Sequence, residues 1–457
     1  MQRNVVIVMT KLRVLTMLLV LIQGSWTCSP KRNKCQGTAL DYDGASLSSE
    51  DLALEWIEWT ESQPDCDLEL DQILLRAVRQ GYPRVVGLLL DKGAYVNARE
   101  HTITSLGERI VGETALGVAA KIGNLEVVTI LIEHGADINA KTGRLYYFED
   151  FYPTPLENAL DDGHLEVATI LIKHGANVNT TDSLGKTALM KTASNGYLES
   201  VTLLIENGAD INATNIRGET ALMYAVGDGK LKVVTLLLEN GADIGAQNAE
   251  GETALMYAVR RGNIRIDIIR DGKIEVVTIF TYNGADIGAQ YKEGKTALMY
   301  EAAKGNLESV TLLTENGADI GAQNAKGETA LMYAVQYGFL KVVNFLTENG
   351  ADIGAQNKEG KTALMYAAAY GNLEAVTLLT ENGADIGAQD QEGETALMYA
   401  ARHRGDLNVL TLLIKNGADT NAKNANGETA LMLFKAYGKG SGPGNLFLLS
   451  KIEKILA

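Results

Sequence analysis

The chain has few of the side chains that most often carry chemistry in an active site. Its 457 residues include three cysteines and five histidines, and no cysteine follows Cys66. Thiol chemistry and thiolate metal sites are therefore excluded from everything after that residue. The histidines form no HExxH pattern, no pair with a cysteine and no convincing set with a serine and an acid. We therefore expect neither an enzyme nor a metal site.

Signatures of a bound cofactor or of nucleic-acid binding are also missing. The stretch GAQNKEGKT at residues 354–362 has five residues between its glycines, one more than a phosphate-binding loop has. The short Asp-to-Asp rhythm of a calcium loop is absent. The formal net charge is −16 and no basic stripe offsets it, so the chain repels nucleic-acid phosphates. We expect no cofactor and no nucleic-acid partner.

The apolar run near the amino terminus is too short to span a bilayer comfortably. It covers residues 14–22, follows basic residues and precedes QGSWTC. This order is typical of a secretory signal peptide, here residues 1–27, starting at Met1 or Met9. The prediction is an exported protein that is periplasmic, envelope-anchored or secreted. The alternative is a cytoplasmic protein in which this segment is not a working signal.

The three cysteines lie at or soon after the end of this segment. Cys28 resembles the lipidated cysteine of bacterial lipoproteins, and the resemblance implies a lipid anchor as the only contact with a membrane. Export implies an oxidising compartment, so we expect Cys35 and Cys66 to form a disulfide. The alternative is three unpaired thiols in a protein that is not exported.

The most abundant feature of the chain is a repeated sequence motif. The threonine of the pattern G-[EK]-T-A-L returns at a spacing of 33 residues, with one spacing of 43 and a last one of 34. A fixed period of this length predicts a solenoid, in which each unit stacks on the next. The threonines that mark the phase are Thr187, Thr220, Thr253, Thr296, Thr329, Thr362, Thr395 and Thr429, with earlier copies at Thr114 and Thr154.

Each unit predicts two helices and an extended turn. Thr220 is placed to cap the first helix, ALMYAV supplies its packing residues, and Gly229 stops it. KVVTLLLEN forms a second helix with one apolar face, and ADIGAQNAEG leads to the next unit. Asn212 and Gly245 occupy the same turn position in different copies, and we expect this exchange because both residues tolerate positive φ.

The pattern G-x-T-A-L-M-x-A-x-x-x-G-x-L-x-V-V-x-L-L-x-x-N-G-A-D-I-N-A resembles the ankyrin repeat. About ten or eleven units follow one another from residue 68 onward. Only TPLE at Thr154 keeps the family's proline, and methionine usually replaces its histidine, so methionine packing must replace the Thr–His network. The resemblance implies an all-α solenoid of stacked helix pairs with β-hairpin fingers along one edge. It also implies a protein-binding scaffold without catalysis.

The segments that flank the array are expected to cover its ends. Residues 28–67 include SSEDLALEWIEW, which predicts a capping helix whose tryptophans cover the first unit. The array is expected at 68–437. Residues 438–457 join the flexible GKGSGPG to NLFLLSKIEKILA, a helix expected to cover the last unit.

Three insertions interrupt the rhythm, and irregular places in a regular array carry individual function. The first lies between residues 98 and 114, the second between 140 and 154, and the third between 262 and 272. The first two belong to adjacent fingers, so we expect them to touch. One hypothesis is a partner-binding knob, and the alternative is a local core that pins the hairpins together. The aromatic residues of the second insertion are Tyr146, Tyr147, Phe148, Phe151 and Tyr152.

Two positions of the inner helices are informative. At the first, a tyrosine recurs once per unit, and these tyrosines form either a binding stripe or, alternatively, packing contacts between neighbouring units. The residues just before the helix-ending glycine vary most, and in the ankyrin family such positions face the concave side and meet partners. These residues are Asp228, Arg261, Lys304, Tyr337, Tyr370 and His403, of which we assign Tyr337 and Tyr370 to the predicted site.

One unit carries Glu301 where related copies have alanine. A carboxylate on the slim inner helix needs a partner, and an arginine of the third insertion, Arg265 or Arg270, is one candidate. The alternative is that the side chain reaches solvent.

These observations predict an exported, non-catalytic scaffold that binds another protein. Binding is expected through the extended amino-terminal fingers or the concave face. The alternative is a structural spacer of the cell envelope, whose length matters more than any groove.

Overall fold

The structure is a computed structural model in which two compact units are distinguished. It describes residues 50–51, 53–54, 57, 70–103, 109–141, 144–146, 149–151, 153–261, 280, 283–403, 407–437 and 454. The first unit comprises Met1–Thr192 and Tyr197–Asp210, and the second comprises Ala193–Gly196 and Ile211–Ala457. Each unit is described by itself below.

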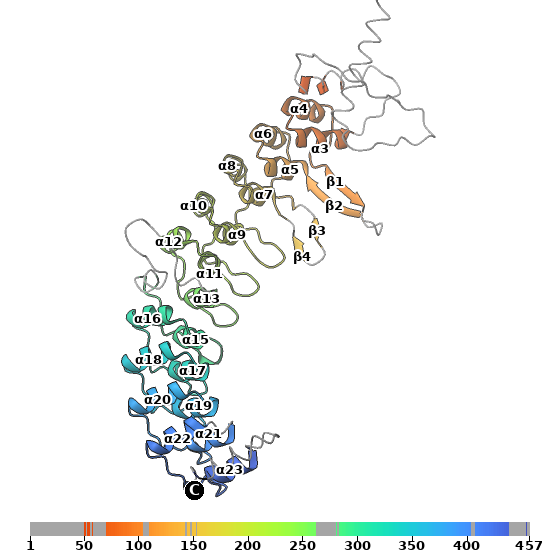
Figure 1. Cartoon of the computed structure of the whole chain (residues 1–457). Helices are drawn as coiled ribbons and strands as arrows, with labels where there is room; N and C mark the ends of the chain where they lie inside the picture. Colours follow the sequence, from red (N-terminus) through yellow and green to blue (C-terminus); the bar gives the residue numbers. More distant parts are fainter. Residues whose placement is uncertain are drawn as a thin grey trace, which may run out of the picture. The chain divides into compact units, whose positions relative to one another are not determined.

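The first unit is built of helix pairs. The first helix of each pair is called inner here and the second outer. Inner helices pack against inner helices and outer against outer, so the pairs form two layers (Figure 1). The inner helices are α3 (Leu70–Gln80), α5 (Ala115–Ile122), α7 (Pro155–Asp161) and α9 (Ala188–Asn195), whose last three residues belong to the second unit. The outer helices are α4 (Pro83–Asp91), α6 (Leu125–Glu133), α8 (Leu165–Lys173) and α10 (Leu198–Glu206).

The second unit continues the same architecture, which confirms the expected all-α repeat solenoid. Its inner helices are α11 (Ala221–Gly227), α13 (Ala254–Arg261), α15 (Ala297–Lys304), α17 (Ala330–Gln336), α19 (Ala363–Tyr370), α21 (Ala396–His403) and α23 (Ala430–Tyr437). Its outer helices are α12 (Leu231–Glu239), α16 (Leu307–Glu315), α18 (Leu340–Glu348), α20 (Leu373–Glu381) and α22 (Leu407–Lys415), and a short 3-10 turn, η1, spans Lys292–Gly294. The third insertion, 262–272, lies outside the described residues.

The ends of the helices follow from local chemistry. Thr220 accepts a hydrogen bond at its hydroxyl from the backbone N–H of Met223, at 3.3 Å, and so caps α11. Gly229, just after that helix, has a φ of 71°, a conformation in which a side chain would be strained. The same threonine cap opens α5, α7, α15, α17 and α19. The predicted start and stop signals are therefore confirmed.

The core runs between the two helix layers. In the pair α11 and α12 it contains Leu222, Met223 and Ala225 from the inner helix, with Val233, Val234 and Leu237 from the outer one. Leu238, the last leucine of the segment KVVTLLLEN, is only half-buried. Methionine fills the position where the ankyrin pattern has histidine, and its exposure there does not exceed 4% except in the last unit, where Met432 is 54% exposed. These buried methionines are Met190, Met223, Met256, Met299, Met332, Met365 and Met398.

The turn at the tip of most fingers is held by one Asn or Asp. Asn215 Oδ1 accepts from the backbone N–H groups of Arg217 and Glu219, both at 2.9 Å. Tyr291 stands at this position in one finger, and Glu293 beside it has a φ of 65°. Because tyrosine cannot accept these two bonds in the same way, this finger folds differently, as η1.

At the turn position where Asn and Gly exchange, the backbone conformation differs from the prediction. Gly245 and its counterparts have no positive φ, so the reason we gave for the exchange is wrong. Asn212 instead joins its finger to the next one: Oδ1 accepts from the N–H of Asp243 at 2.8 Å, and Nδ2 donates to the carbonyl of Gly241 at 3.3 Å. Asn139 and Asn179 make the same two bonds in the first unit. Glycine copies lack the side chain for this link.

Candidate functional site

The first two insertions form antiparallel hairpins in the first unit (Figure 1). β1 (Arg99–Ile103) pairs with β2 (Arg109–Thr114), and β3 (Arg144–Tyr146) pairs with β4 (Glu149–Phe151). Strand β2 contacts β3, and Arg99 Nη1 donates to the carbonyl of Lys141 at 2.8 Å. The two fingers therefore touch, as expected.

The aromatic residues of the second finger lie partly outside the described residues. Tyr146 ends β3 and Phe151 ends β4, where Arg144 is the register partner of Phe151. Tyr147, Phe148 and Tyr152 are outside the described residues. The choice between a binding knob and a local core stays a prediction for all five aromatic residues.

The second unit exposes two tyrosines at neighbouring inner-helix ends. Tyr337 caps the end of α17 and is 56% exposed, and Tyr370 ends α19 and is 55% exposed. Gln336 Nε2 donates to Tyr370 Oη at 3.4 Å, and the ring of Tyr337 lies 6.5 Å from that of Phe339. We call Gln336, Tyr337, Phe339 and Tyr370 the tyrosine patch.

Phe339 is held in place by a glycine of the preceding repeat. A Cβ at Gly305, which has a φ of 73°, would overlap the Phe339 ring. The ring therefore packs where only glycine leaves room. Tyr337 lies beside this packed ring.

The tyrosine that recurs once per unit is buried or half-buried. Tyr257, Tyr333 and Tyr399 are at most 9% exposed. An open binding stripe is therefore not what these rings form, and the packing alternative describes them better. Their contacts show how neighbouring repeats are joined.

A shared carboxylate joins two successive tyrosines. Tyr224 Oη donates to Glu219 Oε2 at 2.7 Å, and Tyr257 Oη of the next repeat donates to Oε1 of the same carboxylate at 3.1 Å. Asn215 Nδ2 also donates to Glu219 Oε2, at 2.8 Å. Burial would raise the pKa of Glu219, but the bonds from Tyr224, Asn215 and Tyr257 outweigh it and hold the pKa below its ordinary value.

The same arrangement returns around Glu328. Tyr333 Oη donates to Glu328 Oε2 at 2.8 Å, and Tyr366 Oη of the next repeat donates to Oε1 at 3.4 Å. Burial, with the nearby Glu328 charge, raises the pKa of Tyr366 to about 12, so its hydroxyl stays protonated and remains a donor.

In some repeats a lysine stands in place of this glutamate, and it contacts the ring of the tyrosine in the next repeat. Lys295 Nζ lies 5.5 Å from the centroid of the Tyr333 ring, and Lys361 Nζ lies 5.8 Å from that of Tyr399. Both distances fit a cation–π contact. Sequence reasoning missed this link, although its signal was present: glutamate and lysine exchange before the threonine while the tyrosine stays.

Glu301 does not reach solvent, because it is 1% exposed. Asn306 Nδ2 donates to its Oε2 at 2.7 Å, and Lys304 Nζ lies 3.8 Å from its Oε1. Burial raises the pKa of this carboxyl, opposed by Ser309, Lys304 and Asn306. Its partners come from its own repeat, and Arg265 and Arg270 lie outside the described residues.

Several predicted features also lie outside the described residues. They are the signal segment 1–27, the cysteines Cys28, Cys35 and Cys66, and most of the closing segment 438–457. Within 48–59, the described residues are helical, and Glu50 Oε1 accepts from the N–H of Arg84 at 2.7 Å.

The described part of the chain contains no group of three His, Cys, Asp or Glu residues that could hold a metal ion. Nor does any described helix combine the length and apolarity needed to cross a membrane.

The two-layer helix pairs, threonine caps and linked fingers place the chain in the class of helical repeat solenoids. A family model described as ankyrin repeats (three copies) matches it at 48–142, 74–182, 144–215, 208–270, 266–357 and 349–424. The chain therefore belongs to the ankyrin-repeat family. Members of this class serve as scaffolds for binding other proteins, and the site to be tested is a surface for such a partner.

Proposed function

We propose that this chain is an exported, non-catalytic scaffold that binds another protein, with the tyrosine patch as one contact surface and the two long fingers as another. The exposure of Tyr337 and Tyr370 carries the proposal. Tyrosine gives a large contact area at little cost in conformational entropy, so it anchors protein interfaces. Related copies place Asp228, Arg261 or Lys304 at this position.

Export is supported by the basic and apolar pattern of residues 1–27. Cys28 would then supply a lipid anchor, and Cys35 with Cys66 a disulfide. Fractionation of cells that express the full chain tests this part. Labelling with a radioactive fatty acid, lost in Cys28→Ala, would support the anchor, and an unprocessed soluble chain would contradict export.

The contact surfaces are tested by site-specific photocrosslinking in the cells of origin. A photoreactive phenylalanine replaces Tyr370 in one version of the chain and Tyr197, which is 40% exposed in the first unit, in a control. A partner captured from position 370 and absent from position 197 supports the tyrosine patch. Equal capture from both positions, or none from 370, contradicts it.

The finger is tested by replacing residues 141–153 with TNIRGE, a plain turn taken from residues 214–219 of this chain. Loss of a crosslinked partner in this version would assign the binding to the aromatic finger. Retention of the partner would leave the tyrosine patch as the surface.

A structural spacer is the second candidate, favoured by the carboxylate and cation–π links between successive repeats. A spacer should lose function in proportion to the number of repeats removed. A binding scaffold should keep its function until the repeats that carry its contact surface are removed.

A further inference from the structure

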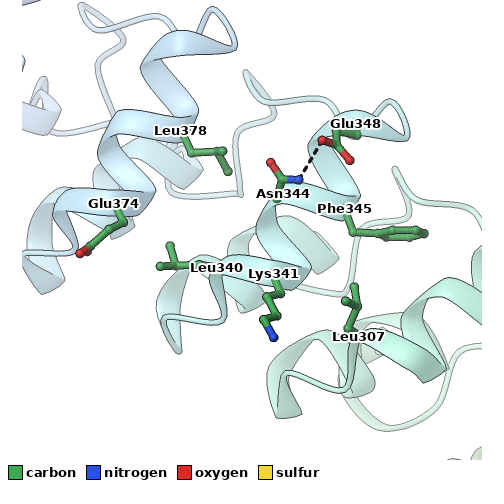
Figure 2. Close-up of a pocket in the computed structure, with 8 residues that line it drawn as sticks. All are labelled: Leu307, Leu340, Lys341, Asn344, Phe345, Glu348, Glu374 and Leu378. Carbon is green, nitrogen blue, oxygen red and sulfur yellow. Dashed lines mark hydrogen bonds between the residues drawn. The ribbon is translucent and has the colours of Figure 1, made fainter.

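The outer-helix layer of the second unit contains an apolar groove of about 530 Å³ (Figure 2). Leu307 of α16, Leu340 and Phe345 of α18, and Leu378 of α20 form its apolar lining, so it extends over three successive outer helices. All four side chains are half-buried. Tyr337 and Tyr370 of the tyrosine patch lie at the ends of inner helices, and only Phe339, which precedes Leu340, adjoins this layer. The inference is argued from the groove alone and does not depend on the proposed function.

The groove lies where one outer helix departs from its neighbours. Helix α18 reads LKVVNFLTE, whereas α16 reads LESVTLLTE and α20 reads LEAVTLLTE. Thr311 and Thr377 donate their hydroxyls back to their own helices, but Asn344 Nδ2 donates to Glu348 Oε1 at 2.8 Å. The departures at Asn344 and Phe345 therefore enlarge the apolar lining and orient an acidic side chain beside it (Figure 2).

The charge around the groove is strongly one-sided. Helices α16, α18 and α20 carry five glutamates and one basic residue, Lys341. The glutamates are Glu308, Glu315, Glu348, Glu374 and Glu381. Of these charged residues, Glu348, Glu374 and Lys341 line the groove itself. An apolar lining inside an acidic surround is complementary to a helix with one apolar and one basic face.

We propose that this groove binds a basic amphipathic helical segment of a partner protein. Apolar side chains at positions i, i+3 or i+4, and i+7 of that segment would enter the groove among Leu307, Phe345 and Leu378. Its lysines and arginines would lie against Glu348 and Glu374. The pairing of apolar anchors with a charged surround gives both affinity and a preference for basic over acidic helices.

The probe is a fluorescently labelled helical peptide of leucine and lysine, with leucine on one face. Its counterpart has glutamate in place of lysine. Fluorescence anisotropy with the full chain should show binding of the lysine peptide alone. Affinity should fall as salt rises, because exposed charges are screened.

The groove variant Asn344→Thr/Phe345→Leu restores the sequence of the neighbouring helices, so it is expected to fold. We expect it to weaken binding of the lysine peptide at least about fivefold, since it removes apolar contact area. Glu374→Lys should weaken binding further. The matched control is Glu239→Lys on α12, which makes the same charge change away from the groove and should leave the affinity within about twofold.

Three results would overturn the proposal. One is no binding of the lysine peptide. Another is equal weakening by the groove variant and by Glu239→Lys, which would mean a general attraction to an acidic protein. The third is binding that occurs only after residues 438–457 are removed, which would make this chain's own closing segment the occupant.

Discussion

At the scale of single residues, two buried carboxyls have pKa shifts of opposite direction. Glu219 lies in the turn before α11, and Glu301 lies within α15. Glu219 receives three hydrogen bonds, and its pKa is lowered. At Glu301 the effect of burial exceeds that of Ser309, Lys304 and Asn306, so its pKa is raised. Burial raises the pKa of both carboxyls, and the opposing hydrogen bonds outweigh it only at Glu219.

We expect Glu301→Ala, which restores the residue of the related copies, to stabilise the protein at pH 7.5 by about 1–3 kcal/mol, because it removes a poorly satisfied buried charge. The pKa of Glu301 is raised in the folded state, so the cost of its charge is present above that pKa and disappears as pH falls through it. The gain should therefore shrink at pH 4.5, near the ordinary carboxyl value. Urea midpoints of both proteins at the two pH values provide the measurement.

The control for this prediction is Glu315→Ala, which removes an exposed glutamate from α16. It should change the midpoint little and equally at both pH values. A gain for Glu301→Ala that is the same at pH 4.5 and pH 7.5 would show that charge burial is not its cause.

Residue identities predicted local contacts well and distant ones poorly. The threonine caps and the glycine stops depend on neighbours within a few positions, so the pattern contained them. The bond from Tyr257 to Glu219 joins residues 38 positions apart, and it exists only once two repeats are stacked. The exposure of Tyr337 and Tyr370 was predictable, because variation at helix ends marks a surface.

At the scale of elements, the finger turns are joined to the next finger in two different ways. Asn139, Asn179 and Asn212 bond to the next finger, and glycine takes this place from Gly245 to Gly387. The glycine fingers keep a different contact: Gln323 Nε2 donates to the carbonyl of Gln356 at 3.4 Å. The glycine fingers are also joined through the backbone, since the N–H of Lys358 donates to the carbonyl of Lys326 at 2.8 Å. The two kinds of finger therefore differ in which groups make the link.

We expect Gly354→Asn to stabilise the second unit by about 1–2 kcal/mol, through two new hydrogen bonds to the next finger and a less flexible unfolded chain. Gly354 has no positive φ, and a Cβ there would be 3.5 Å from Asp352 Oδ1, an ordinary contact. The measurement is the urea midpoint followed by circular dichroism.

Gly354→Ala serves as its control, since alanine stiffens the unfolded chain without offering the bonds. We expect about half the gain from it. Equal midpoints for the alanine and asparagine variants would mean that the inter-finger bonds add nothing.

The helices were predictable because the repeat period is regular. The prediction was less complete where insertions interrupt the period. Counting the extra residues predicted where the long fingers β1–β2 and β3–β4 lie. It did not predict the register in which their strands pair. The groove on α16, α18 and α20 was not expected, because Phe345 is an ordinary apolar residue until its neighbours are known.

At the scale of the whole molecule, each repeat contacts its neighbours, so stability should be close to a sum over repeats and junctions. Deletion of residues 330–362 removes one period of 33 residues and joins Thr329 to Ala363. We expect this shortened chain to fold, with unchanged helix content per residue and a modestly lower urea midpoint. Circular dichroism at increasing urea measures both.

The matched control removes α18 alone, residues 340–348, and leaves the apolar side of α17 uncovered. It should lose far more stability than the whole-period deletion, although it removes fewer residues. Equal losses would show that the repeat is not the unit of stability.

The recurring tyrosine can contact either a glutamate or a lysine of the preceding repeat. This has a consequence for how the gene can change. Misaligned recombination between near-identical copies adds or removes whole periods and brings together repeats that were not adjacent before. In the shortened chain, Tyr366 would meet Lys295 and Tyr399 would meet Glu328, and both pairings already occur between other repeats. A locus of this kind can therefore vary in length between individuals without each new junction having to evolve its own complementarity.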